Sequence, residues 1–184
     1  MTILRYFGAM ALSMVWGLPV WALIRWLWLR RRKRTTHWGR EMLLGVLVLY
    51  LVALAGQTVL PRIEITLSEI VVEPWNYSGC NYIPLYTIRQ MFLAQKDAPI
   101  YVAVNLLGNV LVFAPLGFLP PLVWKRFESF GVTILFGGGC SLLIELVQPL
   151  VGRNRDVDDL ILNTLGCALG YLLWVLFQRM RKLI

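Results

Sequence analysis

The chain has 184 residues, of which 58% are hydrophobic and only 15% are charged. Soluble domains carry roughly 45–50% apolar and about 25% charged residues. The composition therefore excludes an ordinary soluble domain and predicts a chain that uses lipid as its solvent. The net charge of +8 is assigned to basic residues at the cytoplasmic face of a membrane, and no nucleic-acid partner is expected.

Five segments are long and apolar enough to cross a bilayer, because about 20 helical residues span the ~30 Å hydrocarbon layer. In chain order they are residues 6–29, 42–60, 100–124, 130–151 and 157–177. The first lacks a basic leading region and a clear cleavage site, so we expect a retained anchor. The predicted fold class is all-α, a polytopic transmembrane bundle of about five helices with one irregular extracytoplasmic loop.

The basic residues predict the orientation of these segments. A run of five, at residues 30–34, follows the first segment, and such runs stay in the cytoplasm. With this loop inside, twelve Lys and Arg lie inside and six lie outside. We therefore expect the N-terminus outside and the C-terminus in the cytoplasm. The run 30–34 is also expected to contact anionic lipid.

Residues 61–99 form the only long polar segment of the sequence. Within it, residues 63–67 alternate between apolar and polar side chains, which predicts a short strand. Its Trp and Tyr residues suit the membrane interface. The predicted domains are therefore residues 1–60 with two helices and a basic cytoplasmic loop, 61–99 as an ordered extracytoplasmic loop, and 100–178 as a three-helix core.

The carboxylate of Glu145 lies well inside the apolar segment 130–151. A charge near the centre of a spanning helix costs about 2.5 kcal/mol or more. Glu145 must therefore face the bundle, pair with a cation such as Arg153 or Arg155, or be protonated. Gln148 follows three residues later and shares its helix face. Intramembrane carboxylates are functional candidates by default, so Glu145 is the candidate catalytic residue.

Further polar side chains fall at the same membrane face. Asp156, Asp159 and Asn163 are spaced as one stripe of the last helix, and Asn105 and Asn109 lie four apart on the helix 100–124. We expect these groups to converge on one binding site. Its predicted members are Asn105, Asn109, Glu145, Gln148, Arg153, Asp156, Asp159 and Asn163.

Several of these residues also have a purely structural interpretation. Asp156 or Asp158 suits the N-cap of the last helix, and the helix dipole favours Asp159 in its first turn. Asn105 and Asn163 suit hydrogen bonds between helices, and Gln148, directly before Pro149, suits the end of the helix 130–151. These alternatives stay open at the level of the sequence.

The sequence has three Cys and one His, without a CxxC or CxxH pattern. We therefore expect no metal and no cofactor. The candidates for a hard divalent cation, if one binds, are Asp156, Asp158 and Asp159, because clustered carboxylate oxygens suit such ions.

Small residues spaced four apart let helices approach closely in lipid. Gly166 and Gly170 form one such pair, and Gly137 and Ser141 form another. We expect both pairs to serve the packing of the helix 130–151 against the helix 157–177.

Two stretches resemble the VanZ-like family of bacterial membrane proteins. The first is residues 105–118, NLLGNVLVFAPLGF, and residues 81–85, NYIPL, resemble the family's segment ahead of it. The resemblance covers about residues 80–175. Its second stretch carries Glu145, Gln148, Arg153, Asp156, Asp158, Asp159, the run Asn163-Thr164-Leu165-Gly166, and Gly170.

The resemblance implies a multi-pass protein of the bacterial cell membrane. The family takes its name from a protein associated with resistance to the glycopeptide teicoplanin. It therefore implies lowered glycopeptide susceptibility through binding or altering an envelope component, with the acidic and amide residues at the functional centre. The expected partners are membrane lipid and a lipid-linked envelope precursor or glycopeptide.

Two other functions stay open. A membrane-embedded enzyme acting on a lipid-linked substrate would use Glu145 as a general acid or base. A transporter or proton-coupled channel would use the same carboxylate, but the sequence has no inverted repeat of the kind that many transporters have.

Overall fold

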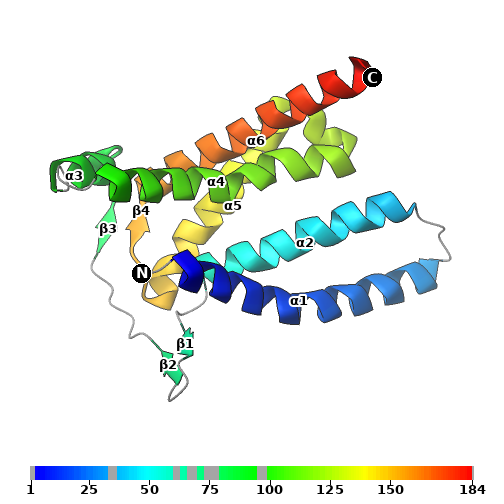
Figure 1. Cartoon of the computed structure of the whole chain (residues 1–184), viewed down its shortest axis with the longest axis horizontal. Coiled ribbons are helices and arrows are strands. Elements are labelled where there is room, and N and C mark those ends of the chain that lie inside the picture. Colours follow the sequence, from blue (N-terminus) through cyan, green and yellow to red (C-terminus); the bar gives the residue numbers. More distant parts are fainter. Residues whose placement is uncertain are drawn as a thin grey trace. The chain divides into compact units, whose positions relative to one another are not determined.

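The computed structural model describes residues 3–32, 37–59, 63–65, 70–72, 79–94 and 99–183, and the side chains of 3–16, 32, 63–65, 70–72 and 101 fall outside this description. Two compact units make up the chain, Met1–Trp75 and Asn76–Ile184 (Figure 1). The boundary lies inside the predicted loop segment 61–99. Each unit is described by itself.

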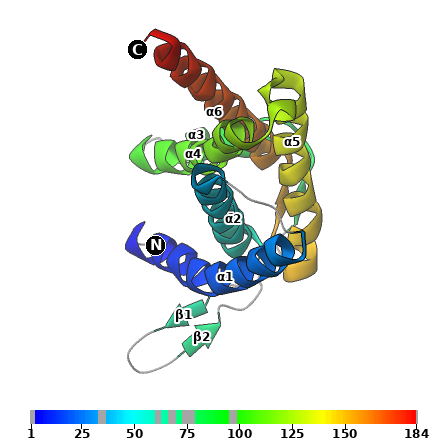
Figure 2. The ribbon, with the colours of Figure 1, turned by 90° about the vertical axis from the view of Figure 1, so that its right-hand side faces the viewer.

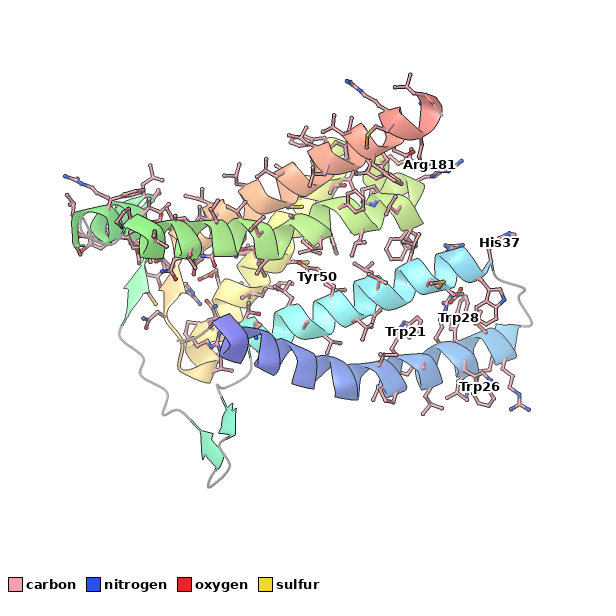
Figure 3. All side chains as sticks on the ribbon, viewed as in Figure 1. Trp21, Trp26, Trp28, His37, Tyr50 and Arg181 are labelled. Atoms are coloured by element: carbon pink, nitrogen blue, oxygen red, sulfur yellow. The ribbon has the colours of Figure 1, made fainter. Side chains whose placement is uncertain are left out.

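The first unit is a hairpin of two helices, α1 (Ile3–Arg32) and α2 (Trp38–Thr58). Gly45 of α2 lies against the ring of Trp21, and an added Cβ there would stand 3.1 Å from that ring. Figure 3 shows Trp21 and Trp28 on the side of α1 that faces α2, and Trp26 on the opposite side. The missing side chain of Gly45 thus makes room for a Trp ring within the hairpin.

An ion pair joins the two helices of this hairpin. The Arg25 guanidinium donates from Nε to Oε2 and from Nη2 to Oε1 of Glu41, both at 2.7 Å. Planar two-point pairing of this kind is the strong form of an Arg–carboxylate contact. It neutralises Arg25, which lies within the first predicted spanning segment.

The strands of the first unit are short. β1 (Ile63–Ile65) pairs antiparallel with β2 (Ile70–Val72), with Ile63 opposite Val72. β1 confirms the strand that alternation predicted within residues 63–67.

The second unit begins with β3 (Cys80–Asn81), α3 (Tyr86–Ala94) and α4 (Pro99–Val123). The one-turn helix η1 (Lys125–Glu128) leads into α5 (Phe130–Val147). After it come η2 (Gln148–Val151), β4 (Arg155–Asp156) and α6 (Val157–Leu183). α4, α5 and α6 form a three-helix bundle (Figure 2). α3 lies inside the segment that the sequence analysis expected to be an irregular loop.

Small residues set the close packing of α6 on α4. An added Cβ at Gly170 would collide with the carbonyl oxygen of Ala114, and one at Gly166 would collide with that of Val110. Gly137 of α5 lies against the Cys167 side chain of α6. The Gly137–Ser141 pair thus lies where the sequence placed it, whereas the Gly166–Gly170 pair serves the α4 contact instead of the α5 contact. The sequence shows that two residues on one helix face are small, but it does not show which neighbouring helix packs against them.

Among the described residues, four helical segments are long and apolar enough to span a membrane: Trp38–Thr58, Val102–Val123, Phe130–Val151 and Val157–Leu183. They confirm the predicted all-α, multi-pass membrane bundle. The predicted first span is helical as part of α1 but is not among the four. Because the side chains of residues 3–16 lie outside the description, the fifth span stays a prediction.

Candidate functional site

The site forms where α5 ends and α6 begins, at a reversal of the chain. Gly152 has a φ of +71°, a left-handed conformation that glycine adopts without strain. Its N–H donates to the Pro149 carbonyl at 3.2 Å, and the Arg153 N–H donates to the Gln148 carbonyl at 2.8 Å. These bonds end η2 and turn the chain back towards β4.

β4 then pairs in parallel with β3, a segment 75 residues earlier in the chain. Cys80 stands opposite Arg155, and Asn81 stands opposite Asp156. This pairing brings residues 80–81 to the turn between α5 and α6. Local sequence patterns give no indication of it.

Glu145 is buried on α5, with only 3% of its surface exposed. Its Oε2 accepts the backbone N–H of Asp156 at 2.8 Å. With its amide nitrogen turned towards this carboxylate, Gln148 donates to both Glu145 oxygens at 3.2 Å. The predicted shared face of Glu145 and Gln148 is therefore confirmed, and the carboxylate is held by fixed donors on both sides.

Arg155 caps the end of α5. Its Nε donates to the backbone carbonyl of Glu145 at 2.9 Å, and its Nη2 donates to that of Leu146 at 3.5 Å. The last carbonyls of a helix lack intrahelical partners, and a cation there is favoured by the helix dipole. Its Nη1 also lies 3.4 Å from the Tyr82 hydroxyl. Arg155 therefore joins α5, β4 and the segment after β3.

Asp156 is the N-cap of α6. Its Oδ1 accepts the N–H of Asp158 at 2.9 Å, the bond expected of an N-cap side chain. The same oxygen accepts the Asn81 side-chain amide at 2.9 Å. The capping interpretation of Asp156 is confirmed, and this cap is tied to β3 as well.

Asp158 caps a different helix from its own. It is only 1% exposed, and its carboxylate accepts the N–H groups of Leu85 and Ile88 at the start of α3, the second at 3.0 Å. Leu85 has a φ of +65°, in the left-handed region that side chains rarely adopt. The carboxylate thus binds a turn whose backbone is strained.

Two amides bridge α6 to its neighbours. The Asn109 amide of α4 donates to Oδ1 of Asp159 at 2.6 Å, where both residues are half-buried. Deeper in the bundle, the buried Asn163 donates to the Ser141 hydroxyl of α5 at 2.9 Å. The interhelical interpretation of Asn163 is therefore confirmed. Asn105 lies one turn from Asn109 on α4 and is half-buried.

The three aspartates point to three different sets of partners. Asp156 binds Asn81 and its own helix, Asp158 binds α3, and Asp159 binds Asn109. Within the described part of the chain, no three His, Cys, Asp or Glu side chains are grouped as ligands for a metal ion. In this arrangement the three carboxylates are not brought together, and each is held by partners of its own.

Six of the eight predicted residues fall into three groups. Glu145, Gln148 and Asp156 share one network, Asn109 and Asp159 form a second contact, and Asn163 lies deeper with Ser141. Arg153 contributes its backbone N–H to the turn.

Asn81, Arg155 and Asp158 take part in these networks but do not belong to the predicted set. Asn81 had a signal, since it begins the stretch 81–85 that carries part of the family resemblance. Arg155 was noted only as a possible partner of Glu145. Asp158 belongs to the second stretch of the family resemblance, and its side chain was expected to cap its own helix or bind a cation.

A model of the family described as VanZ/LLP1 matches residues 47–178, more than two thirds of the chain. No curated protein and no solved structure matches this chain. The matched range includes every residue of the networks described above.

Proposed function

Because the chain belongs to the VanZ/LLP1 family, we propose that it lowers susceptibility to glycopeptide antibiotics such as teicoplanin. It would do so by binding or altering a lipid-linked component of the cell envelope at its polar site. The coarser statement, that it is a VanZ-like multi-pass membrane protein of the envelope, rests on the family and on the four apolar helices.

The observation that carries the proposal is the buried carboxylate of Glu145 in an apolar span. Such a group is costly in a membrane, and here it is held by the Asp156 N–H and the Gln148 amide. Preorganised polar groups of this kind favour ligand recognition because little ordering is needed on binding.

The chemistry of the half-buried neighbours favours a polar headgroup as ligand. Asn109 and Asp159 together offer carboxylate and amide oxygens, which accept hydrogen bonds from hydroxyl, amine and amide N–H groups. Sugar and peptide parts of a lipid-linked envelope precursor carry such donors. The membrane supplies the lipid part of the ligand, so lipid is a partner in the proposal.

The proposed orientation puts the N-terminus outside and the C-terminus in the cytoplasm. The basic residues support it, with the run 30–34 inside. The turn between α5 and α6 then faces the outer leaflet, where glycopeptides act on precursors.

The test is teicoplanin and vancomycin susceptibility in a susceptible Gram-positive host. The wild type, Glu145→Ala, Asp159→Asn and Leu143→Ala are compared at matched membrane levels. Leu143 is the matched control, since it is exposed on the apolar face of the same helix as Glu145. We expect protection by the wild type and by Leu143→Ala, and loss of protection in both site variants. Absence of protection by the wild type would overturn the proposal.

The second candidate is a membrane-embedded enzyme that acts on a lipid-linked substrate. The observation that favours it is the same burial of Glu145, since a carboxyl group shielded from water suits general acid–base catalysis. Mass spectrometry of membrane lipids from cells with wild type and Glu145→Gln separates the two functions. A lipid product that requires Glu145 supports the enzyme, and an unchanged lipid profile alongside protection supports binding.

A further inference from the structure

α3 has an unusual surface for so short a helix. None of its nine residues, all described by the structure, is buried. Phe92 and Leu93 are 57% and 52% exposed, and in the preceding turn Ile83 and Leu85 are 64% and 58% exposed. These large apolar side chains need an apolar environment to be shielded from water.

The opposite side of α3 is docked on the bundle. Thr87, Ile88 and Met91 are half-buried, and the Asp158 carboxylate of α6 holds the first turn. Thr87 also accepts the Asn81 amide at 3.1 Å. α3 lies across the start of α4 (Figures 1 and 2). Its orientation is therefore set by Asp158 at the start of α6 and by Asn81 of β3.

α3 lies close in sequence to a helix that is long and apolar enough to span a membrane. The span of α4 begins at Val102, only eight residues after the end of α3. Large apolar side chains are exposed at the start of α4 too, with Ile100 at 79% and Val104 at 52%. Both α3 and the first turns of α4 therefore present apolar side chains that need shielding from water.

Arg89 adds a charge to this exposed face. It is exposed, and it precedes Phe92 and Leu93 by three and four residues, so the three side chains are neighbours on the helix surface. A cation between apolar side chains suits the headgroup layer, where a long stem lies along acyl chains and the guanidinium reaches phosphate. A second copy of the chain would have to bury this charge in an apolar contact.

We propose that α3 and the turn before it, residues 82–85, form a membrane-surface anchor. Its apolar side chains enter the boundary between headgroups and acyl chains, in the leaflet next to the polar site, and Arg89 binds lipid phosphate. Amphipathic helices with an apolar face and basic residues lie in the membrane interface in this way. The partner is the phospholipid bilayer, and the inference does not depend on the proposed function.

Photocrosslinking of the full-length chain in liposomes tests the anchor. Phe92 is replaced by p-benzoylphenylalanine in vesicles of phosphatidylethanolamine and phosphatidylglycerol, and adducts are identified by mass spectrometry. Leu111, which is 66% exposed within the α4 span, provides the lipid-facing control. Asn154, exposed in the turn between α5 and α6, provides the water-facing control.

We expect lipid adducts at position 92 at a yield close to that of position 111. A yield as low as that of position 154 overturns the anchor, and so does crosslinking mainly to a second copy of the chain. Lipid adducts at position 111 in the same preparation report that the protein is folded and inserted. Addition of Arg89→Gln should lower the ratio of phosphatidylglycerol to phosphatidylethanolamine adducts at position 92, because the guanidinium favours the phosphate of an anionic lipid over that of a zwitterionic one. An unchanged ratio contradicts a contact between Arg89 and anionic headgroups.

Discussion

The Asp158 carboxylate of α6 and the backbone N–H of Ile88 in α3 lie 3.0 Å apart and join two helices that are distant in sequence. The same carboxylate accepts the Leu85 N–H. A negative charge at the first turn of a helix satisfies unpaired N–H groups and is favoured by the helix dipole. The position of α3 therefore depends on a residue at the start of α6.

Replacement of Asp158 by Ala should release α3 from the bundle. The loss of an N-cap side chain costs about 0.5–2 kcal/mol, and a buried N–H left without a partner costs about 1–3 kcal/mol. We expect faster amide hydrogen exchange in residues 85–94 of Asp158→Ala in nanodiscs, with exchange in the centre of α5 unchanged. Mass spectrometry of the exchanged peptides provides the measurement.

The control variants separate the cap from a general loss of stability. Asp158→Asn keeps one acceptor oxygen and should show an intermediate effect. Gln90→Ala changes an exposed residue of α3 and should leave exchange as in the wild type. If α3 of Asp158→Ala exchanges its amide hydrogens as slowly as α3 of the wild type, this carboxylate does not hold the helix.

The contact between Asn109 and Asp159, at 2.6 Å, should couple α4 to α6. Polar contacts between membrane helices are worth about 0.6 kcal/mol on average and up to about 1.7 kcal/mol. We expect a coupling free energy within this range from a double-mutant cycle of Asn109→Ala and Asp159→Ala. The measurement is the free energy of unfolding in bicelles.

A second cycle provides the reference for this coupling. It combines Asn109→Ala with Tyr171→Phe, because Tyr171 lies 12 residues beyond Asp159 on α6 and donates instead to the Glu128 carbonyl. Such distant pairs are additive within about 0.3–0.5 kcal/mol. If the coupling free energy of the first cycle is no larger than that of this reference cycle, Asn109 and Asp159 do not stabilise the bundle through this bond.

The sequence predicts those features of the site that depend on local periodicity. Glu145 and Gln148 share a face because they lie three apart on one helix, and Asp156 caps α6 because the apolar span begins directly after it. The membrane bundle follows in the same way from the length and apolar character of its spans.

What the sequence does not predict depends on contacts between distant segments. The bond from Asn81 to Asp156 joins residues 75 apart, and the bonds of Asp158 join α6 to the turn before α3. No local pattern specifies these partners, because they depend on how β3 pairs with β4. The contact of Gly166 and Gly170 also depends on packing between distant segments. The prediction that they meet the helix 130–151 is therefore wrong, and they meet α4 instead.

Gly170→Ala should separate α4 from α6, whereas Gly139→Ala should not. An added Cβ at Gly170 meets the backbone oxygen of Ala114, which cannot rotate away, while one at Gly139 meets nothing within 4 Å. Overpacking costs about 1–3 kcal/mol, and Ala is favoured over Gly within a helix by about 0.8–1.0 kcal/mol. We therefore expect Gly139→Ala to keep or raise the midpoint temperature of unfolding in detergent and Gly170→Ala to lower it. Equal midpoints in the two variants would mean that α6 does not approach the α4 backbone as closely as the packing of Gly170 requires.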